Sequence, residues 1–325
     1  MKFALSAEQA AFRDAVRELL AKECTPAVVR SAWDAAPGQL DRGVWQSLDA
    51  MGVLGLLVSE ADGGMGLDET FLVPVLEECG RAALPHPIVE TAMVAAPLIG
   101  ADAGMVATCW SDRWAPHAMV ADLLLVRAGD QLWRVPAEAA GRVAQPTLDG
   151  SRAAAELWWN PAEDPNGQLV TDDPAAVALA FDRGALGTAA VLVGLGQAML
   201  DLTVGYVTQR QQFGVPIGSF QAVKHHLADA ALALEFARPV VWRAAWSVAH
   251  DERTRGRDVS MAKAMASDAA ALVGRKALQC HGAIGYTVEA DLHLFMKRAW
   301  ALARAWGDTA HHTDRIAAAL EADQR

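Results

Sequence analysis

Two short segments in the second half of the chain carry residue types suited to binding a phosphate group. Residues 209–223 read QRQQFGVPIGSFQAV, and residues 277–286 read ALQCHGAIGY. The guanidinium of Arg210 offers paired N–H donors that match phosphate oxygens. Gly282 would let a ligand come close to the backbone, because no Cβ intervenes. The alternative is a plain polar loop between two helices, with Gln279 capping a helix C-terminus.

Metal chemistry is not expected from the histidines or cysteines. His225–His226 and His311–His312 are adjacent pairs, and neighbours on a helix point about 100° apart, so neither pair can easily share one ion. We expect these histidines to face solvent or an interface. The four cysteines are far apart with no CxxC spacing, which argues against a zinc site or a disulfide framework.

Helical patterns fill the first 103 residues, which must help to position these segments. Ser6 and Gln9 have the form of a capping box at the start of the first helix. The residues ADGGMG at 61–66 form a turn cluster, and prolines bracket a further short helix. We predict three longer helices, over residues 7–22, 44–51 and 69–81.

The middle of the chain has a different pattern. Short apolar runs, ADLLLV at 121–126 and QLWRV at 131–135, are separated by turn signals such as Gly129-Asp130. This spacing predicts a small β domain over residues 104–171.

From residue 172 to residue 325 the helical pattern returns. One apolar stripe runs from Leu192 to Tyr206 in steps of three and four, and a longer one runs from Val223 to Val248. Pro239 is expected to kink or break that second helix. Asp258 is expected to be the N-cap of a third helix, which runs to about Cys280.

Composition excludes several classes of protein. A chain of 325 residues with 53% hydrophobic residues can bury a large core, and its net charge of −11 argues against nucleic-acid binding. Charged residues occur too early in MKFALSAEQAAFRD for a signal peptide. The least charged run, residues 184–200, is interrupted by glycine and polar residues, so we expect a buried or interface helix and not a membrane span. A cytoplasmic location is expected.

The two segments, together with SEADGGMGLDETFLVPVLEECGR at 59–81, resemble the acyl-CoA dehydrogenase family over nearly the whole chain. The resemblance implies a mainly α fold with a small β domain. It places an N-terminal helical domain at 1–103, a reduced β domain at 104–171 and a C-terminal four-helix bundle at 172–325.

The resemblance also implies a bound FAD, gripped at its pyrophosphate and ADP part and held mainly by a neighbouring subunit. Arg210 would bind the pyrophosphate, Phe213 would pack near the adenine end, and Gln221 would reach the phosphate–ribitol region. Gln279 and Gly282 would approach the ADP part across a subunit interface. The second segment departs from the family pattern at Ala283 and Ile284, where Gly and a polar residue are usual.

The family reaction is α,β-dehydrogenation of an acyl-CoA thioester, in which a glutamate removes the α-proton and hydride passes to the flavin. Matching the two positions known to carry that glutamate gives Trp306 and Gly184, so both are without a base. Asp308 is the nearest alternative base. It is more simply explained as a solvated or helix-capping acid, as are two other carboxylates near the matched segments, Asp182 and Glu289. Trp300 and Trp306 are either pocket or core residues.

The middle domain lacks counterparts of the family's TEP-x-x-GSD and W-x-T/S-N segments, which hold the flavin ring. The resemblance therefore implies half of an α2β2 heteromer, with a homologous catalytic subunit that supplies the flavin cradle and the glutamate. Such pairs in the family act on steroid side-chain CoA thioesters, and an electron-transfer flavoprotein would be the acceptor. Two alternatives stay open: a flavin-free scaffold, and a homomeric dehydrogenase that uses Asp308.

Overall fold

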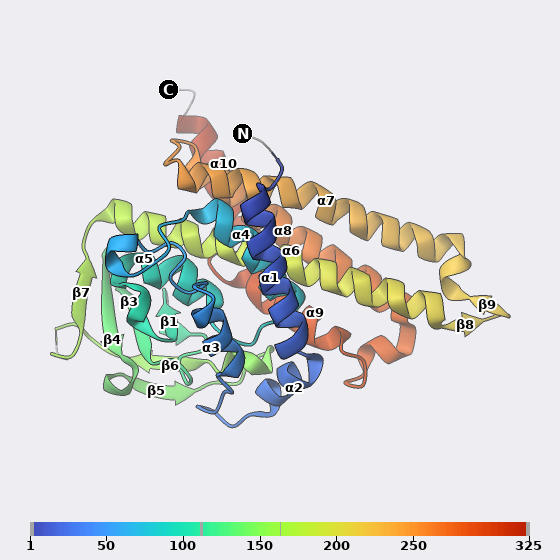
Figure 1. The fold of residues 1–325 in the computed structure, drawn as a ribbon, viewed down its shortest axis with the longest axis horizontal. Helices are drawn as coiled ribbons and strands as arrows, with labels where there is room; N and C mark the ends of the chain where they lie inside the picture. The colour runs from blue at the N-terminus through green and yellow to red at the C-terminus, as the bar shows by residue number, and fades with distance from the viewer. Residues whose placement is uncertain (1–2, 111–112, 163, 323–325) are drawn as a thin grey trace.

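The computed structural model describes residues 3–110, 113–162 and 164–322. Helices form both terminal parts of the chain, and the strands of residues 106–171 lie at one end of the molecule (Figure 1). The N-terminal helices are α1 (Ala7–Glu23), α2 (Pro26–Asp34), α3 (Gly43–Ala50), α4 (Glu69–Arg81), a π-helix (Val89–Ala95) and α5 (Ala96–Ile99).

Three predicted N-terminal helices are confirmed to within about two residues at each end. The capping box at the start of α1 is present, with Ser6 and Gln9 each accepting from the other's backbone N–H. Helix α2 was not predicted, although Pro26 stands at its first position, where a missing N–H costs nothing.

The predicted β region is also confirmed. Strands in it form a four-stranded sheet in the order β1-β3-β4-β7 and a three-stranded sheet in the order β2-β6-β5. Only the β1–β3 pairing within these sheets is parallel. The strands are β1 (Val106–Cys109), β2 (Trp114–Ala115), β3 (Leu123–Ala128), β4 (Gln131–Pro136), β5 (Gly141–Ala144), β6 (Ala155–Trp158) and β7 (Gln168–Thr171).

The C-terminal part is a bundle of long helices, joined near one end by the short hairpin of β8 (Gln211–Gln212) and β9 (Val215–Pro216). Helix α6 is the one described helix long and apolar enough to cross a membrane, but 72% of its most apolar window is buried inside the structure. The helices are α6 (Pro174–Gln209), α7 (Gln221–Ala249), α8 (Arg255–His281), α9 (Leu292–Arg304) and α10 (Thr309–Ala322).

Two residues of this bundle correct the sequence predictions. Pro239 was expected to kink or break α7, and the helix is not broken but continues through the proline. Residues on both sides of the proline anchor α7 to α4, because Arg238 and Trp242 both donate to the Glu77 carboxylate, at 3.2 and 2.8 Å. This packing outweighs the lost backbone hydrogen bond. Asp258 is not the N-cap of α8 but lies in its first turn, after the cap residue Thr254.

Helices α4 and α6 pack so closely that their contact requires glycine. A Cβ on Gly194 would lie 1.9 Å from the carbonyl oxygen of Glu77, and one on Gly80 would lie 2.2 Å from that of Val191. The two helical parts of the chain thereby share one hydrophobic core.

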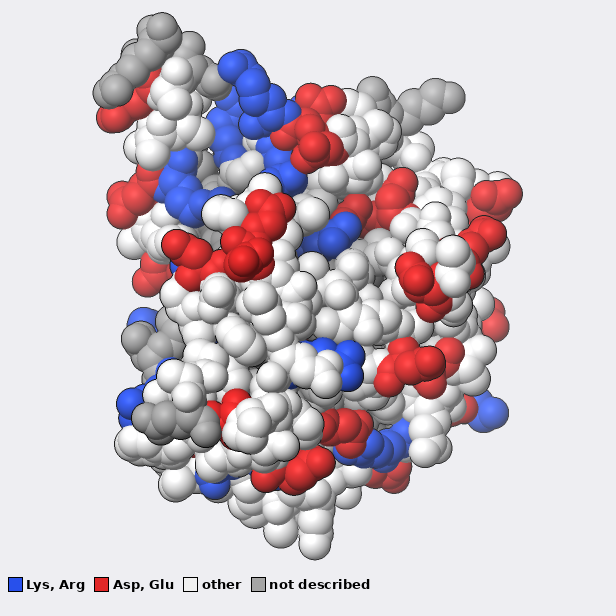
Figure 2. Space-filling model, turned by 90° about the vertical axis from the view of Figure 1, so that its left-hand side faces the viewer, with Lys and Arg blue, Asp and Glu red and all other residues white. Residues whose placement is uncertain are grey.

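On the face shown in Figure 2, basic side chains are interspersed with acidic ones and form no broad basic surface.

Candidate functional site

The first phosphate-type segment forms a hairpin that projects from one end of the bundle (Figure 1). Helix α6 ends at Gln209, and the β8–β9 turn consists of Phe213 and Gly214, with φ of 55° and 80°. Positive φ at both central residues is the geometry of a tight hairpin turn with a right-handed strand twist. Phe213 is strained in this conformation and its side chain is 92% exposed. The hairpin therefore presents an aromatic ring to solvent.

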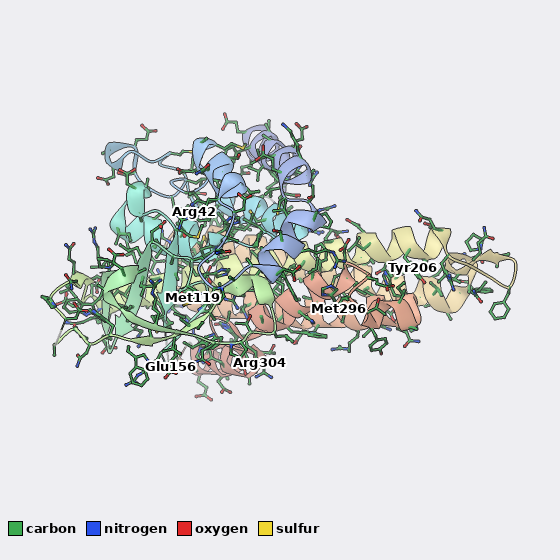
Figure 3. The ribbon with its side chains drawn as sticks, turned by 90° about the horizontal axis from the view of Figure 1, so that it is seen from below. Arg42, Met119, Glu156, Tyr206, Met296 and Arg304 are labelled. Carbon is green, nitrogen blue, oxygen red and sulfur yellow. The ribbon has the colours of Figure 1, made fainter. Side chains whose placement is uncertain are left out.

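The second segment ends α8 at the same end of the molecule. The rings of Tyr206, on the last turn of α6, and His281, the last residue of α8, stack at 4.5 Å. Lys276 ties α8 to the start of α7 through Asp229 at 2.9 Å. Figure 3 shows Tyr206 near this end, far from Arg304.

All five predicted cofactor residues thus lie at the hairpin end. Four are exposed through their side chains: Arg210, Phe213, Gln221 and Gln279. No hydrogen bond or ion pair of the Arg210 side chain occurs within the described ranges 3–110, 113–162 and 164–322. Gly282 has a φ of 63°, and a Cβ placed on it would meet no atom within 4 Å, so the backbone there is open to a ligand. Ala283 and Ile284 beside it are exposed as well.

The two positions matched to the family base meet at the opposite end of the bundle. A Cβ on Gly184 in α6 would lie only 2.4 Å from Cδ2 of Trp306, so the indole ring lies directly on the Gly184 backbone. Trp306 is 9% exposed and has a φ of 56°, a strained conformation for a bulky residue. One aromatic ring therefore occupies the space in front of both positions.

A cavity of about 380 Å³ opens beside this contact. Trp110 lies 4.9 Å from Trp306 and Phe181 lies 6.1 Å from it, between ring centroids. The buried pair Glu90–Arg152, at 3.6 Å, also lines the cavity. Sequence reasoning missed this pair, because only the fold brings the π-helix that carries Glu90 next to the strand region that carries Arg152.

A buried lysine holds the Trp306 loop in place. The ammonium of Lys263, in α8, is fully buried and donates to the carbonyls of Ala303 and Gly307 and to Ser267, at 3.0 to 3.2 Å. Burial lowers the pKa of Lys263 from its ordinary value of 10.5 to about 7. Sequence reasoning missed Lys263, since a single lysine in a helix normally points to solvent.

His312 is a correction to the expectation of solvent-facing histidines. It is 0% exposed, its Nε2 lies 2.9 Å from the Trp306 carbonyl oxygen, and burial lowers its pKa to about 4. His225 and His311 are exposed, and His226 lies 3.2 Å from Lys276. No cluster of potential metal ligands occurs among the described residues.

The three candidate carboxylates are either exposed or paired with arginines, and none lines the cavity. Asp308 is exposed, outside the residues that line the cavity, and accepts from the His311 N–H at 2.9 Å at the start of α10. Asp182 is buried between Arg255 and Arg315, at 3.1 and 2.8 Å. Glu289 lies exposed in the segment after α8.

Trp300 and Trp306 differ in their burial and in their position relative to the cavity. Trp300 is 42% exposed on α9 and does not line the cavity, whereas Trp306 is both buried and part of its wall. Of the two, Trp306 is therefore the residue that contacts this space.

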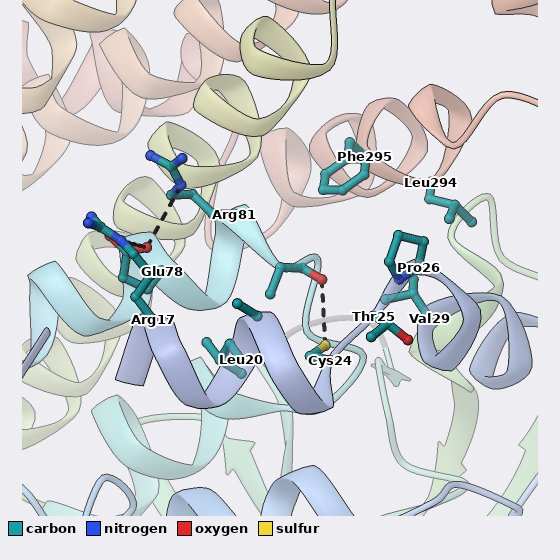
Figure 4. Close-up of a pocket in the computed structure, with 12 residues that line it drawn as sticks. Arg17, Leu20, Cys24, Thr25, Pro26, Val29, Glu78, Arg81, Leu294 and Phe295 are labelled. Atoms are coloured by element: carbon teal, nitrogen blue, oxygen red, sulfur yellow. Dashed lines mark hydrogen bonds and ion pairs between the residues drawn. The ribbon is translucent and has the colours of Figure 1, made fainter. Parts of the chain in front are cut away.

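A second cavity of about 380 Å³ lies between α1, α2, α4 and α9 (Figure 4). Its arginines are already neutralised, because Arg17 binds Glu78 at 2.7 Å and Arg81 binds Asp201 at 2.7 Å. The Cys24 thiol donates weakly to the Ala82 carbonyl, and burial raises its pKa to about 12, which keeps it unreactive. This cavity therefore has no evident chemistry.

Comparison with known proteins identifies the family. Residues 6–103 match the family description "Acyl-CoA dehydrogenase, N-terminal domain" and residues 175–321 match "Acyl-CoA dehydrogenase, C-terminal domain". The acyl-CoA dehydrogenase IpdE2 of Mycolicibacterium smegmatis is 31% identical over 97% of this chain and 99% of its own length. The chain belongs to the acyl-CoA dehydrogenase family.

Solved structures share the acyl-CoA dehydrogenase fold. One, described as the ChsE4-ChsE5 complex from Mycobacterium tuberculosis, aligns with a TM-score of 0.85 at 23% identity over 99% of both chains. Another, described as a Tcur3481-Tcur3483 steroid ACAD variant, aligns with a TM-score of 0.84 at 24% identity over 98% of both chains.

A second relative found by sequence is the acyl-CoA dehydrogenase IpdE2 of Mycobacterium tuberculosis. It is 31% identical over 90% of this chain and 91% of its own length.

The exposed groups at the hairpin end fit the phosphate half of the FAD that this family binds. A guanidinium, two amides and an open glycine backbone are donors of the kind that a pyrophosphate requires. The opposite end does not offer an obvious place for an acyl group to react at Gly184, since the Trp306 ring covers it. The two ends thus differ in what they can bind.

Proposed function

We propose that this chain is the non-catalytic subunit of a heteromeric, FAD-dependent acyl-CoA dehydrogenase, with a homologous catalytic subunit as its partner. In an α2β2 assembly it completes the partner's FAD site and contributes no base to the reaction. The substrate is an acyl-CoA thioester with a bulky, steroid-like acyl group, and an electron-transfer flavoprotein takes the electrons. A cytoplasmic location accompanies this role.

The contact between Trp306 and Gly184 carries the proposal. A base must come within reach of the substrate α-carbon, and here an apolar ring fills the space in front of both matched positions. The nearest other carboxylate, Asp308, lies outside the cavity and accepts from a backbone N–H. Descriptions of two structurally similar proteins name a complex and a steroid enzyme, which supports the choice of partner and substrate class.

Residues at the hairpin end give the chain its own part in the reaction. FAD supplies the hydride acceptor for the oxidation when it is bound. Arg210 would bind its pyrophosphate, Phe213 would cover its adenine end, and Gln221 would reach the phosphate–ribitol region. Gln279 and Gly282 would contact the ADP part from the end of α8.

Co-expression tests the proposal. The chain expressed alone should be colourless, and co-expression with a homologous catalytic acyl-CoA dehydrogenase subunit should yield a yellow complex that oxidises acyl-CoA. Stoichiometric FAD and turnover from the chain alone would contradict the proposal and favour the homomeric enzyme. An active complex whose FAD affinity does not change when the hairpin residues are replaced would favour a scaffold.

Asp308 separates the proposed role from a homomeric enzyme. Asp308→Asn in the complex should leave turnover within about tenfold, roughly 1.4 kcal/mol in the barrier. Replacing the glutamate of the partner subunit should lower turnover by about 10²–10⁴-fold or more. A loss of several hundredfold in Asp308→Asn, with FAD still bound, would show that this chain carries its own base.

A further inference from the structure

The cavity beside Trp306 has flat apolar walls. Three aromatic rings form these walls. The ring centroid of Trp306 lies 4.9 Å from that of Trp110 and 6.1 Å from that of Phe181. Trp114 stands at its edge and is 42% exposed. The volume of about 380 Å³ is in the range of small-molecule sites. Aromatic rings in this arrangement favour a ring-shaped apolar ligand.

Arg152 provides the cavity with a buried cation that is not fully satisfied. Its side chain is 8% exposed and its closest acid, Glu90, is 3.6 Å away, beyond hydrogen-bond distance. The Nε of Arg152 is buried with no hydrogen-bond partner among the described residues. An unsatisfied buried donor is costly, so an acceptor in the cavity would be stabilised.

Charge around the cavity favours an anion. Arg127 and Arg304 line it as well, both exposed at its surface, and Arg127 is already paired with Asp130 at 3.7 Å. Among the described lining residues, three arginines accompany one glutamate. Glu90 and Arg152 are both buried, and this burial raises the pKa of Glu90 and lowers that of Arg152. A ligand with one negative charge would give Arg152 a hydrogen-bond acceptor, and the nearby arginines would offset its repulsion from Glu90.

We propose that this cavity binds a small ring-bearing carboxylate, a free acid and not a thioester, with its ring among the tryptophans and its carboxylate on Arg152. A carboxylate matches the guanidinium with two parallel hydrogen bonds. The Trp306 ring, which lies on Gly184, forms the floor of this site. The site is built from this chain alone and requires neither FAD nor a partner subunit.

Calorimetric titration of the flavin-free 325-residue chain tests this site, with 2-naphthoate as the probe and 2-naphthamide as its neutral counterpart. The acid should bind at least about tenfold more tightly than the amide. Arg152→Gln should weaken naphthoate binding by at least about tenfold. Arg134→Gln is the matched control, since Arg134 is exposed on β4 outside the cavity, and it should leave binding unchanged.

Two surface variants keep the test decisive if Arg152→Gln fails to fold. Trp114→Ala and Arg127→Gln alter exposed edges of the cavity, and each should weaken naphthoate binding while the circular dichroism spectrum stays native. Absence of naphthoate binding, equal affinity for acid and amide, or binding unchanged in both edge variants would overturn the site. These outcomes do not depend on flavin, so they are independent of the proposed heteromer.

Discussion

The surroundings of Arg210 and Trp306 determine what each side chain can bind or contact. Arg210 lies exposed after α6 with no ion pair of its side chain among the described residues, and it is available to an outside anion. Trp306 is held by its neighbours in a strained backbone conformation against Gly184. Sequence could single out Arg210, because its motif is local. It could mark Trp306 as a missing base but could not show that the indole touches Gly184, 122 positions away.

The role of Arg210 leads to a prediction about flavin affinity. Replacing Arg210 with Ala in the complex removes charge-assisted hydrogen bonds to the pyrophosphate, each worth about 1.5–3 kcal/mol. FAD should therefore dissociate about 10–100-fold more readily, as measured by flavin retention after dilution and dialysis, while helical content is unchanged. Arg134→Ala, an exposed arginine on β4, is the control. Full retention of FAD in Arg210→Ala would remove this residue from the site.

At the scale of elements, the closest contacts are those that sequence periodicity cannot reveal. The apolar stripe of α6 indicated a buried helix, yet it did not show which glycine meets α4. Likewise, Pro239 was expected to disturb α7, and only the fold shows Arg238 and Trp242 holding that helix against Glu77. Long-range packing therefore decides what local propensity leaves open.

Two glycines of α6 give a matched test of this packing. Gly194→Ala should destabilise the protein by about 1–3 kcal/mol or more, because its Cβ would lie 1.9 Å from the Glu77 carbonyl oxygen. In Gly205→Ala the added Cβ would meet no atom within 4 Å, so this change should stabilise the helix by about 0.5–1 kcal/mol. Chemical denaturation of both variants measures the difference. Equal effects would mean that α4 and α6 are not in this close contact.

Lys263, which donates from α8 to the loop between α9 and α10, should make the free energy of unfolding depend on pH. Its folded pKa is lowered from 10.5 to about 7 by burial, so between those pH values the unfolded chain binds more protons than the folded chain. The unfolding free energy should therefore rise with pH across this window, by at most about 1.4 kcal/mol per pH unit from this group. Lys263→Met should lack this part of the rise.

Denaturation curves at several pH values from 7 to 10 measure this contribution as the difference between wild type and Lys263→Met. Lys297→Met is the control, since Lys297 is partly exposed and lies over the Trp33 ring, away from the loop. A difference that stays constant with pH would show that Lys263 keeps its ordinary pKa.

At the scale of the whole molecule, sequence predicted the mainly helical fold with a small β region, and this is confirmed. The order of apolar patterns and the two segments were enough for that. The division of the chain at residues 103 and 171 and the roles of the five cofactor residues stay predictions. The cavity with Glu90 and Arg152 and the buried Lys263 could not be predicted, because residues from distant segments form them.

The two ends of the molecule lead to a prediction about flavin stoichiometry. If this chain provides only the pyrophosphate grip at its hairpin end, each FAD needs one copy of it and one catalytic subunit. An α2β2 tetramer should therefore hold two FAD molecules. Native mass spectrometry of the intact complex, combined with flavin absorbance after denaturation, measures this ratio. In Arg210→Ala the tetramer should persist while the ratio falls. Four FAD per tetramer would mean that this chain also holds a complete flavin, and the non-catalytic role would have to be abandoned.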